Sequence, residues 1–393
     1  MRRLRSLAVM LLALAAVPRL EAQRIRLLVP IDDLERKVAA DSNDAPAHYD
    51  LGLAYWLVKR YDLAEQQLRL AIKIEPHTAA AYLALSFLPY ARRERLWDEV
   101  EKGKVPAEWQ PVLEEAWSFR RQAFLLDPMV DLKPLALMIP PSNSFGLSRN
   151  ADAIHTFIMN GFGSFWDGQY GRAYQFFQQI GGNPTADDRK KFPGWFLWYE
   201  GLAAAHIGEF ATAEADFRLL MERAEAEVRE SGGATLAFSD ANHYRYTLAC
   251  ILDQAGRAKE AVALLQEAMT NDAGLYMAHV RLANILQDQH RASAAIEERR
   301  RAVNANPEDA TLVFDLGEAL ARAGEMTEAQ AALRQARQAN PRNVRALYVL
   351  GIVSSQVGST DEAREAFTQF LALAPSRFSD QKTEAQRRLQ QLK

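Results

Sequence analysis

Small and apolar residues recur every 34 positions along the C-terminal part of the chain, with polar segments between them. Two series of small residues have this spacing: Ala249, Ala283, Gly317, Gly351, and Ala261, Ala295, Ala329, Ala363. Proline follows at the same interval at Pro307, Pro341 and Pro375. Small side chains let two antiparallel helices cross closely, and proline ends a helix because it has no backbone N–H. Each unit therefore predicts helix, turn, helix, turn.

The same pattern occupies the N-terminal half with interruptions. The segment 45–78 carries it at Leu51, Gly52, Tyr55, Ala64, Leu68, Ala71 and Pro76. A second unit begins around Ser86, but the small residues of its second helix, Ala116 and Ala123, come 18 positions late. This delay predicts an insertion at 89–106. Two further units are centred on Gly161 and Gly201.

These positions resemble the signature of the tetratricopeptide repeat (TPR), whose period is 34 residues. The resemblance implies an all-α fold, a right-handed α-solenoid of antiparallel helix pairs, with about eight repeats between residues 45 and 375. Residues 23–44 then form an N-terminal half-repeat cap, and 376–393 form a C-terminal capping helix. Such polar ends are expected because terminal repeats must stop further stacking.

Connectors divide the predicted solenoid into three blocks. The repeats occupy 45–128, 151–224 and 242–375, the last block holding four contiguous repeats. The connector 225–241 contains a polar, glycine-containing run. The connector 129–150 is apolar and rich in proline, so we expect it to pack against another part of the protein.

The first 22 residues have the pattern of a secretory signal peptide. Arg2, Arg3 and Arg5 precede an apolar run from Leu7 to Val17, and Ala22 supplies a small residue at the cleavage position. The run is shorter than the ~20 residues needed to span a bilayer. We therefore expect cleavage after Ala22, export to the periplasm or the extracellular space, and no stable membrane span; an uncleaved anchor is the alternative.

Composition narrows the classes of function. Cleavage would remove four arginines and Glu21, which changes the net charge by three, from −3 to −6. A mildly acidic chain with no long basic stripe is a poor nucleic-acid binder. The lone Cys250 cannot form an internal disulfide. The excess of arginine over lysine suggests a GC-rich, bacterial coding sequence.

The sequence contains none of the catalytic motifs that carry a known mechanism. It has no HExxH, no GxSxG, no phosphate-binding glycine loop and no paired-cysteine metal spacing. Its seven histidines are scattered and do not pair at ligand spacing within a helix. We expect no catalytic residues, no cofactor and no metal.

The resemblance also implies where a partner binds, because the first helix of each TPR lines the concave surface. Offsets along one side of a 3.6-residue helix predict the inward-facing positions. The predicted groove residues are Trp56, His155, Phe162, Phe165, Trp166, Trp195, Trp198, His206, Tyr246, Asn284, Gln287, Arg322 and Tyr348. The groove should be apolar in its N-terminal half and polar in its C-terminal half.

Two interpretations of the apolar half remain open. In the first, residues 89–106 or the connector 129–150 fill it, so that the tryptophans are core. In the second, it is an open aromatic channel, since rings supply a large contact area at little entropic cost. The two interpretations differ most clearly for "KFPGWFLWYEG" (191–201), where Trp195 and Trp198 should face the concavity and are either covered by the chain or open to a partner.

The expected function is a non-enzymatic, exported TPR scaffold that binds another protein or an extended peptide, with a role in cell-envelope assembly. A solute- or glycan-binding component of an envelope transport system, using the same rings, is one alternative. An enzyme without a recognisable motif is the other.

Overall fold

The structure, a computed structural model, describes residues 30–93, 96, 99, 105–131, 153–181, 185–231 and 240–392, without the side chains of residues 153–159, 180, 181, 186, 228, 230 and 231. The predicted signal peptide, most of the apolar connector and the centre of the 225–241 connector lie outside the described residues. The described chain is α-helical, and no strand occurs in it.

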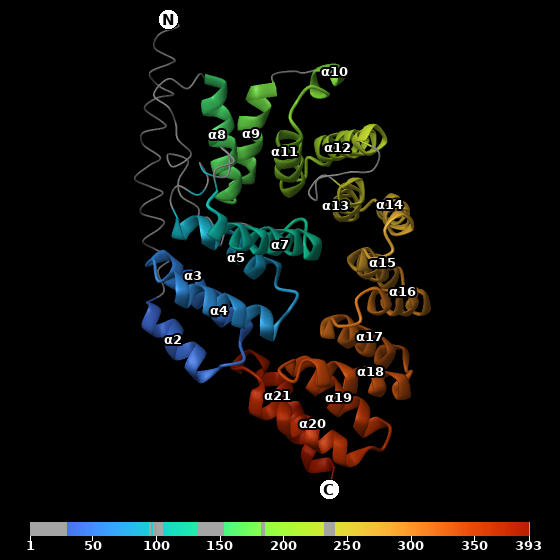
Figure 1. Cartoon of the computed structure of the whole chain (residues 1–393). Helices are drawn as coiled ribbons and strands as arrows, with labels where there is room; N and C mark the ends of the chain where they lie inside the picture. The colour runs from blue at the N-terminus through green and yellow to red at the C-terminus, as the bar shows by residue number, and fades with distance from the viewer. Residues whose placement is uncertain are drawn as a thin grey trace, which may run out of the picture.

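The N-terminal part is a single helix followed by two helix pairs (Figure 1). Its elements are α2 (Ile31–Ala40), α3 (Ala45–Leu57), α4 (Tyr61–Ile74), α5 (Ala79–Arg92), η1 (Ala107–Trp109) and α7 (Gln110–Leu126). Helix α3 packs on α4, and α5 packs on α7. The predicted half-repeat thus appears as α2.

Two pairs and one short helix form the middle of the chain. They are α8 (Ala153–Trp166), α9 (Tyr170–Gly181), α10 (Ala186–Arg189), α11 (Gly194–His206) and α12 (Phe210–Ser231). Helix α12 continues through the first residues of the predicted 225–241 connector, and α13 already begins at Ala241.

The C-terminal part contains four consecutive pairs and a final helix. Its elements are α13 (Ala241–Gln254), α14 (Ala258–Asn271), α15 (Tyr276–Asp288), α16 (Ala292–Ala305), α17 (Ala310–Ala323), α18 (Met326–Ala339), α19 (Val344–Gln356), α20 (Thr360–Leu373), η4 (Ser376–Phe378) and α21 (Ser379–Gln391). Each helix packs mainly on its sequence neighbours, which is the nearest-neighbour packing of a solenoid. The predicted all-α solenoid of antiparallel helix pairs with a C-terminal capping helix is confirmed.

The series of small residues marks the places where the two helices of a pair touch. A Cβ atom on Gly351 would lie 2.6 Å from Cε1 of Phe367, and one on Gly161 would lie 2.7 Å from Cε1 of Phe177. Both phenylalanines are fully buried. A larger residue on the first helix would therefore push the pair apart.

The predicted insertion at 89–106 begins later than expected. Helix α5 includes Pro89 and ends at Arg92. Leu96, within the insertion, is buried in a small cluster with Tyr90 and Leu113. The described part of the insertion thus packs on α5 and α7 and does not lie over the tryptophans of α11.

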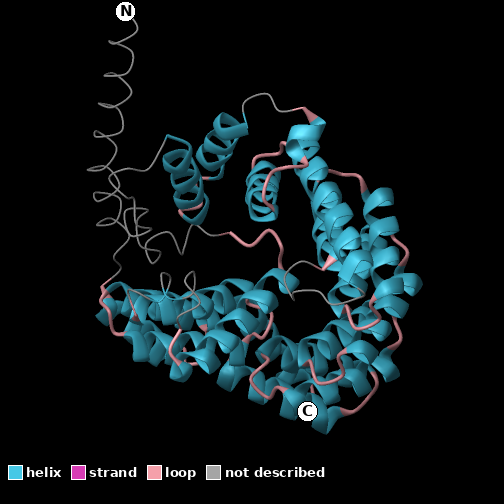
Figure 2. Cartoon of the chain, turned by 45° about the horizontal axis from the view of Figure 1, so that its top comes forward, coloured by secondary structure: helices cyan, strands magenta, loops and turns pink. Residues whose placement is uncertain are grey.

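The solenoid curves until its two ends meet. In Figure 1, α2 and α4 lie beside α21, and in Figure 2 the helices together follow a ring. Asn340 Nδ2 donates to the carbonyl of Ile74 at 3.2 Å, and Asn43 Nδ2 donates to the carbonyl of Arg342 at 2.9 Å. We call this junction between α2–α7 and α13–α21 the seam.

The seam is held mainly by polar contacts. Side chains meet side chains at His77 Nε2 with Asp309 Oδ2 at 2.7 Å, at Ser376 Oγ with Asp41 Oδ2 at 2.7 Å, and at Arg377 Nε with Asp44 Oδ1 at 2.9 Å, among other pairs. Near α7, Tyr246 Oη donates to the carbonyl of Leu125 at 2.8 Å, and Arg281 Nη2 donates to that of Leu126 at 3.1 Å. Such contacts add little stability individually where solvent reaches them.

Candidate functional site

The aromatic stretch 191–201 opens helix α11, which begins directly after Pro193. Trp195 and Trp198 are three residues apart and therefore lie on the same face of the helix. Both line a pocket of about 800 Å³ between α7, α11 and the start of α13. We call it the aromatic pocket. Its walls are formed by Trp117, Ser118, Arg120, Arg121, Gln122, Phe124, Leu125, Gly194, Trp195, Trp198, Tyr199, Asp240, His243, Tyr244 and Leu275.

The two tryptophans differ in how far the chain itself covers them. Phe124 of α7 meets Trp198 edge-on at 5.9 Å between ring centroids, and Phe217 and His243 lie at 5.3 and 5.7 Å. Trp198 is therefore half-buried. Trp195 keeps 42% of its surface exposed, although Phe162 lies at 5.0 Å. Helix α7 closes one side of the site and leaves Trp195 at its mouth.

Four of the predicted groove aromatics lie in the core. Trp56, Phe165, Trp166 and Tyr246 are buried. Successive repeats stack so closely that side chains at the predicted inward-facing positions pack between neighbouring helices. For example, the ring centroids of Phe87 in α5 and Trp166 are 4.8 Å apart. These rings hold the repeats together and present no surface to a partner in this conformation.

The remaining aromatic positions are intermediate. Phe162 is partly buried against Tyr199, at 4.6 Å. His206 stacks on Tyr170 at 3.7 Å, and Tyr348 packs on Phe370 at 5.1 Å. The side chain of His155 lies outside the described part of the chain.

The predicted polar half of the groove is exposed. Asn284 and Gln287 lie on α15, and both of their amide oxygens accept from Arg299 Nη2, at 3.1 and 2.9 Å. Arg322 is exposed on α17 and pairs with Glu318 at 3.1 Å. None of the three lines the aromatic pocket.

Arg120 is a site residue that the sequence prediction missed. In most repeats the residue 16 positions after the small residue of the first helix is leucine or phenylalanine, and it packs on that small residue. The residues at this position are Leu68, Phe177, Phe217, Leu265, Leu333 and Phe367. In the second repeat the small residue is Ser86, and when the 18-residue delay is included the equivalent position is Arg120. The other exception is Arg299, opposite Ala283.

The two arginines at this position have different surroundings. Arg299 donates to two amide oxygens, whereas Arg120 makes no hydrogen bond within the described part of the chain. The Nε and Nη2 atoms of Arg120 are shielded from solvent, and its guanidinium carbon lies 4.5 Å from the ring centroid of Phe87. Burial lowers the pKa of Arg120.

Two neighbouring titratable groups, His243 and Tyr199, are neutral near pH 7. Burial lowers the pKa of His243 to about 4, and burial raises the pKa of Tyr199 above its ordinary value, against the charge of Arg120. Asp240 accepts from the backbone N–H of Asn242 at 2.9 Å and so caps α13. The pocket therefore combines apolar rings with the charged residues Arg120, Arg121 and Asp240.

A buried acidic pair supports the outer side of α11. Arg189 Nη2 pairs with Glu200 at 2.9 Å and also with Asp216, and Gln178 Nε2 donates to Glu200 at 2.8 Å. Burial, followed by the charge of Glu200, raises the pKa of Asp216 to about 7, although Arg189 opposes the shift. Asp216 Oδ2 is buried without a hydrogen-bond partner. One arginine thus faces two carboxylates, and one of these keeps a proton near neutral pH.

We expect this pair to make the protein less stable as the pH rises from about 4 to about 7. In that window the folded state keeps a proton on Asp216 that the unfolded chain has released, so the free energy of unfolding falls by up to about 1.4 kcal/mol per pH unit. Asp216→Asn should remove this slope in thermal unfolding followed by circular dichroism. Asp361→Asn, at a fully solvated surface position, is the control. An unchanged slope in Asp216→Asn would contradict the assignment.

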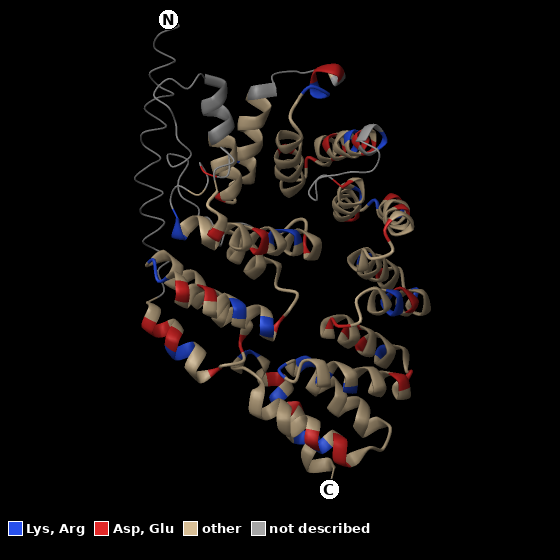
Figure 3. Cartoon of the chain, in the orientation of Figure 1, with Lys and Arg blue, Asp and Glu red and all other residues tan. Residues whose placement is uncertain are grey.

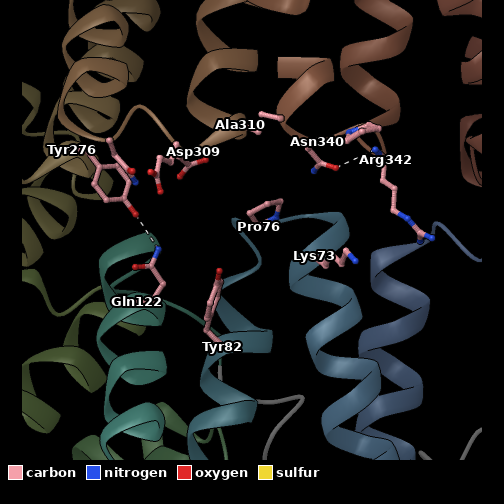
Figure 4. Close-up of a pocket in the computed structure, with 13 residues that line it drawn as sticks. Lys73, Pro76, Tyr82, Gln122, Tyr276, Asp309, Ala310, Asn340 and Arg342 are labelled. Carbon is pink, nitrogen blue, oxygen red and sulfur yellow. Dashed lines mark hydrogen bonds between the residues drawn. The ribbon is translucent and has the colours of Figure 1, made fainter. Parts of the chain in front are cut away.

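A second pocket, of about 620 Å³, lies at the seam (Figure 4). Lys73, Pro76, Tyr82 and Gln122 line it from one side, and residues of α15, α17 and the turn before α19 line it from the other. Gln122 Nε2 donates to Tyr276 Oη across it at 2.9 Å. Its polar lining residues include side chains that hydrogen-bond across the seam and so join the two ends of the solenoid.

Charge and metal-ligand patterns add no further site. Figure 3 shows acidic and basic residues interspersed along the helices. Within the described residues, no group of histidine, cysteine, aspartate and glutamate is arranged to hold a metal ion. Nor does any described helix have both the length and the apolar character to cross a bilayer.

The arrangement of the helices and the comparison with family models together identify the type of repeat. Consecutive antiparallel helix pairs define an α-solenoid repeat protein. Models described as tetratricopeptide repeats match residues 45–78, 280–330 and 327–378. The chain carries tetratricopeptide repeats, as the 34-residue pattern predicted.

Solved structures with low sequence identity share parts of this arrangement. The C-terminal part of a TPR repeat-containing protein from Cytophaga hutchinsonii is 13% identical, with a TM-score of 0.45 over 57% of this chain and 83% of that one. YrrB, described as a TPR protein with an unusual peptide-binding site, is 18% identical, with a TM-score of 0.37 over 54% and 97%. The pilF protein of Pseudomonas aeruginosa is 16% identical, with a TM-score of 0.38 over 60% and 97%. No curated protein matches the sequence significantly.

Proposed function

We propose that this protein is an exported, non-enzymatic scaffold that binds another polypeptide through the aromatic pocket, in cell-envelope assembly. Its TPR solenoid is of a type consistent with protein–protein interaction. The export step relies on the signal-peptide pattern of residues 1–22, and the non-enzymatic role relies on the absence of catalytic motifs from the sequence.

The observation that carries the proposal is the exposed ring of Trp195 at the mouth of the aromatic pocket. A tryptophan that keeps 42% of its surface in solvent, next to a concave site of about 800 Å³, is the arrangement of an interface anchor. Single exposed apolar side chains are common on protein surfaces, so the concave site beside Trp195 is what distinguishes it. Because the pocket is concave and partly closed by α7, it suits one inserted side chain or chain end better than a broad flat partner.

We expect Trp195→Ala to abolish capture of the partner. The test uses the mature protein as bait, cross-linked to its own envelope fraction, with the captured proteins then identified. Leu373→Ala is the matched control, because Leu373 is a comparably exposed apolar residue far from the pocket. A protein captured by the wild type and by Leu373→Ala but lost with Trp195→Ala supports the proposal. Equal capture by all three would refute it.

A further inference from the structure

Arg120 has no hydrogen-bond partner among the described residues, and it stands at a position where most repeats have leucine or phenylalanine. Arg120 lies on α7 at the position of Leu68 and Phe177, yet it makes no hydrogen bond within the described part of the chain. A buried charge that lacks a partner costs free energy, whereas an apolar residue at the same position would not. The contact with the ring of Phe87 offsets only part of this cost.

Arg299 shows how the fold pairs an arginine at this position when no ligand is involved, although its Nε atom is also buried without a hydrogen-bond partner. Two amide oxygens, from Asn284 and Gln287, accept from its guanidinium. Among the described residues no equivalent acceptor reaches Arg120, although its side chain lines the aromatic pocket. Because Nε and Nη2 of Arg120 are shielded from solvent, a molecule bound in the pocket would supply an acceptor to the remaining guanidinium nitrogen, Nη1.

The other walls restrict the chemistry of that molecule. Trp195, Trp198 and Tyr244 offer ring surface, and His243 next to them is neutral at pH 7 because burial lowers its pKa. Asp240 also lines the pocket, but its carboxylate already caps α13. The site thus has aromatic walls and three charged lining residues, Arg120, Arg121 and Asp240, of which Arg120 lies against the ring of Phe87.

We propose that the aromatic pocket binds a carboxylate carried on an apolar or aromatic body, with the carboxylate on the guanidinium of Arg120 and the body against Trp195 and Trp198. Guanidinium and carboxylate match in shape and charge, and such pairs are strong where water is excluded. A pocket of about 800 Å³ has room for a ligand of this size. The inference rests on the binding role proposed for the same pocket. A free organic acid and the C-terminal residue of a polypeptide both carry this chemistry.

The test compares 3-phenylpropionate with its neutral amide by isothermal titration calorimetry on the whole mature protein. We expect the acid to bind at least about tenfold more tightly, since a hydrogen-bonded charge contributes on this scale. Arg120→Leu should abolish the difference between acid and amide. Arg299→Leu, the same change at the equivalent position, should preserve it. Equal affinities in the wild type, no binding of the acid, or discrimination that survives Arg120→Leu would each overturn the inference.

Folding of the variants is measured alongside binding. Leucine is already used at this position by other repeats, so Arg120→Leu should keep or raise the thermal midpoint of the ligand-free protein. Arg120→Met, which retains a long side chain, is the second variant. A lower midpoint in both would assign Arg120 a structural role and overturn the inference.

Peptides distinguish the two sources and separate this inference from the proposed function. One peptide ends in phenylalanine with a free carboxylate, and its pair ends in the carboxamide. Preference for the free peptide, lost in Arg120→Leu, indicates a polypeptide C-terminus; preference for free 3-phenylpropionate over both peptides indicates an organic acid. If both peptides bind equally and Trp195→Ala abolishes their binding, the scaffold proposal stands and the carboxylate inference fails.

Discussion

Replacing Phe217 with alanine is expected to lower the free energy of unfolding by about 3–5 kcal/mol and to destroy the aromatic pocket. Phe217 is fully buried, and a Cβ atom on Gly201 would lie 3.0 Å from its Cε2 atom. Its ring also supports the pocket, with Trp198 at 5.3 Å and Tyr244 at 6.4 Å. Truncation would leave a cavity between α11 and α12 and release Trp198. Urea unfolding and tryptophan emission measure the two effects.

Phe367→Ala is the matched control for this prediction. Phe367 has the same repeat position in the α19–α20 pair and is also fully buried against a glycine, Gly351. Because each repeat contacts mainly its neighbours, the loss of stability should be comparable but confined to the C-terminal end. Ligand binding should survive in Phe367→Ala at low temperature and fail in Phe217→Ala. Equal loss of binding in both variants would contradict this account of the pocket.

Cutting three contacts of the seam is expected to open the ring. The combined variant His77→Ala, Asn340→Ala, Arg377→Ala removes side chains that bridge the N-terminal and C-terminal helices. Each contact contributes about 0.2–1.5 kcal/mol, so their joint loss is comparable with the stability of a thin, polar interface. Small-angle X-ray scattering should show a larger radius of gyration, while circular dichroism shows unchanged helix content.

The control for the seam is a triple variant with the same number of alanine substitutions. Arg218, Arg301 and Arg387 each pair with a glutamate of their own helix and do not bridge the seam. Their replacement by alanine should leave the scattering profile unchanged. If both triple variants keep the wild-type dimensions, these three contacts do not hold the ring closed.

The repeat architecture was predictable because it depends on local spacing. Gly161, Gly201 and Gly351 each stand 16 residues before a phenylalanine, and this pairing alone specifies which faces of two consecutive helices touch. The same spacing could also have pointed to Arg120. Once the 18-residue insertion is counted, Arg120 occupies the repeat position at which most other repeats have leucine or phenylalanine. Its significance depends on an absent hydrogen-bond acceptor, which spacing does not reveal.

By itself the sequence determined the helix pairs, their order and the place of the aromatic stretch at the start of α11, since these follow from contacts between residues close along the chain. Only the tertiary structure decided that Tyr246 is buried against α7, that Trp195 stays exposed while Trp198 is half-buried, and that the two ends of the solenoid meet. Those outcomes join residues far apart in the sequence, such as Phe124 with Trp198 and Asn43 with Arg342. They depend on the accumulated curvature of many repeats, which no single 34-residue unit encodes.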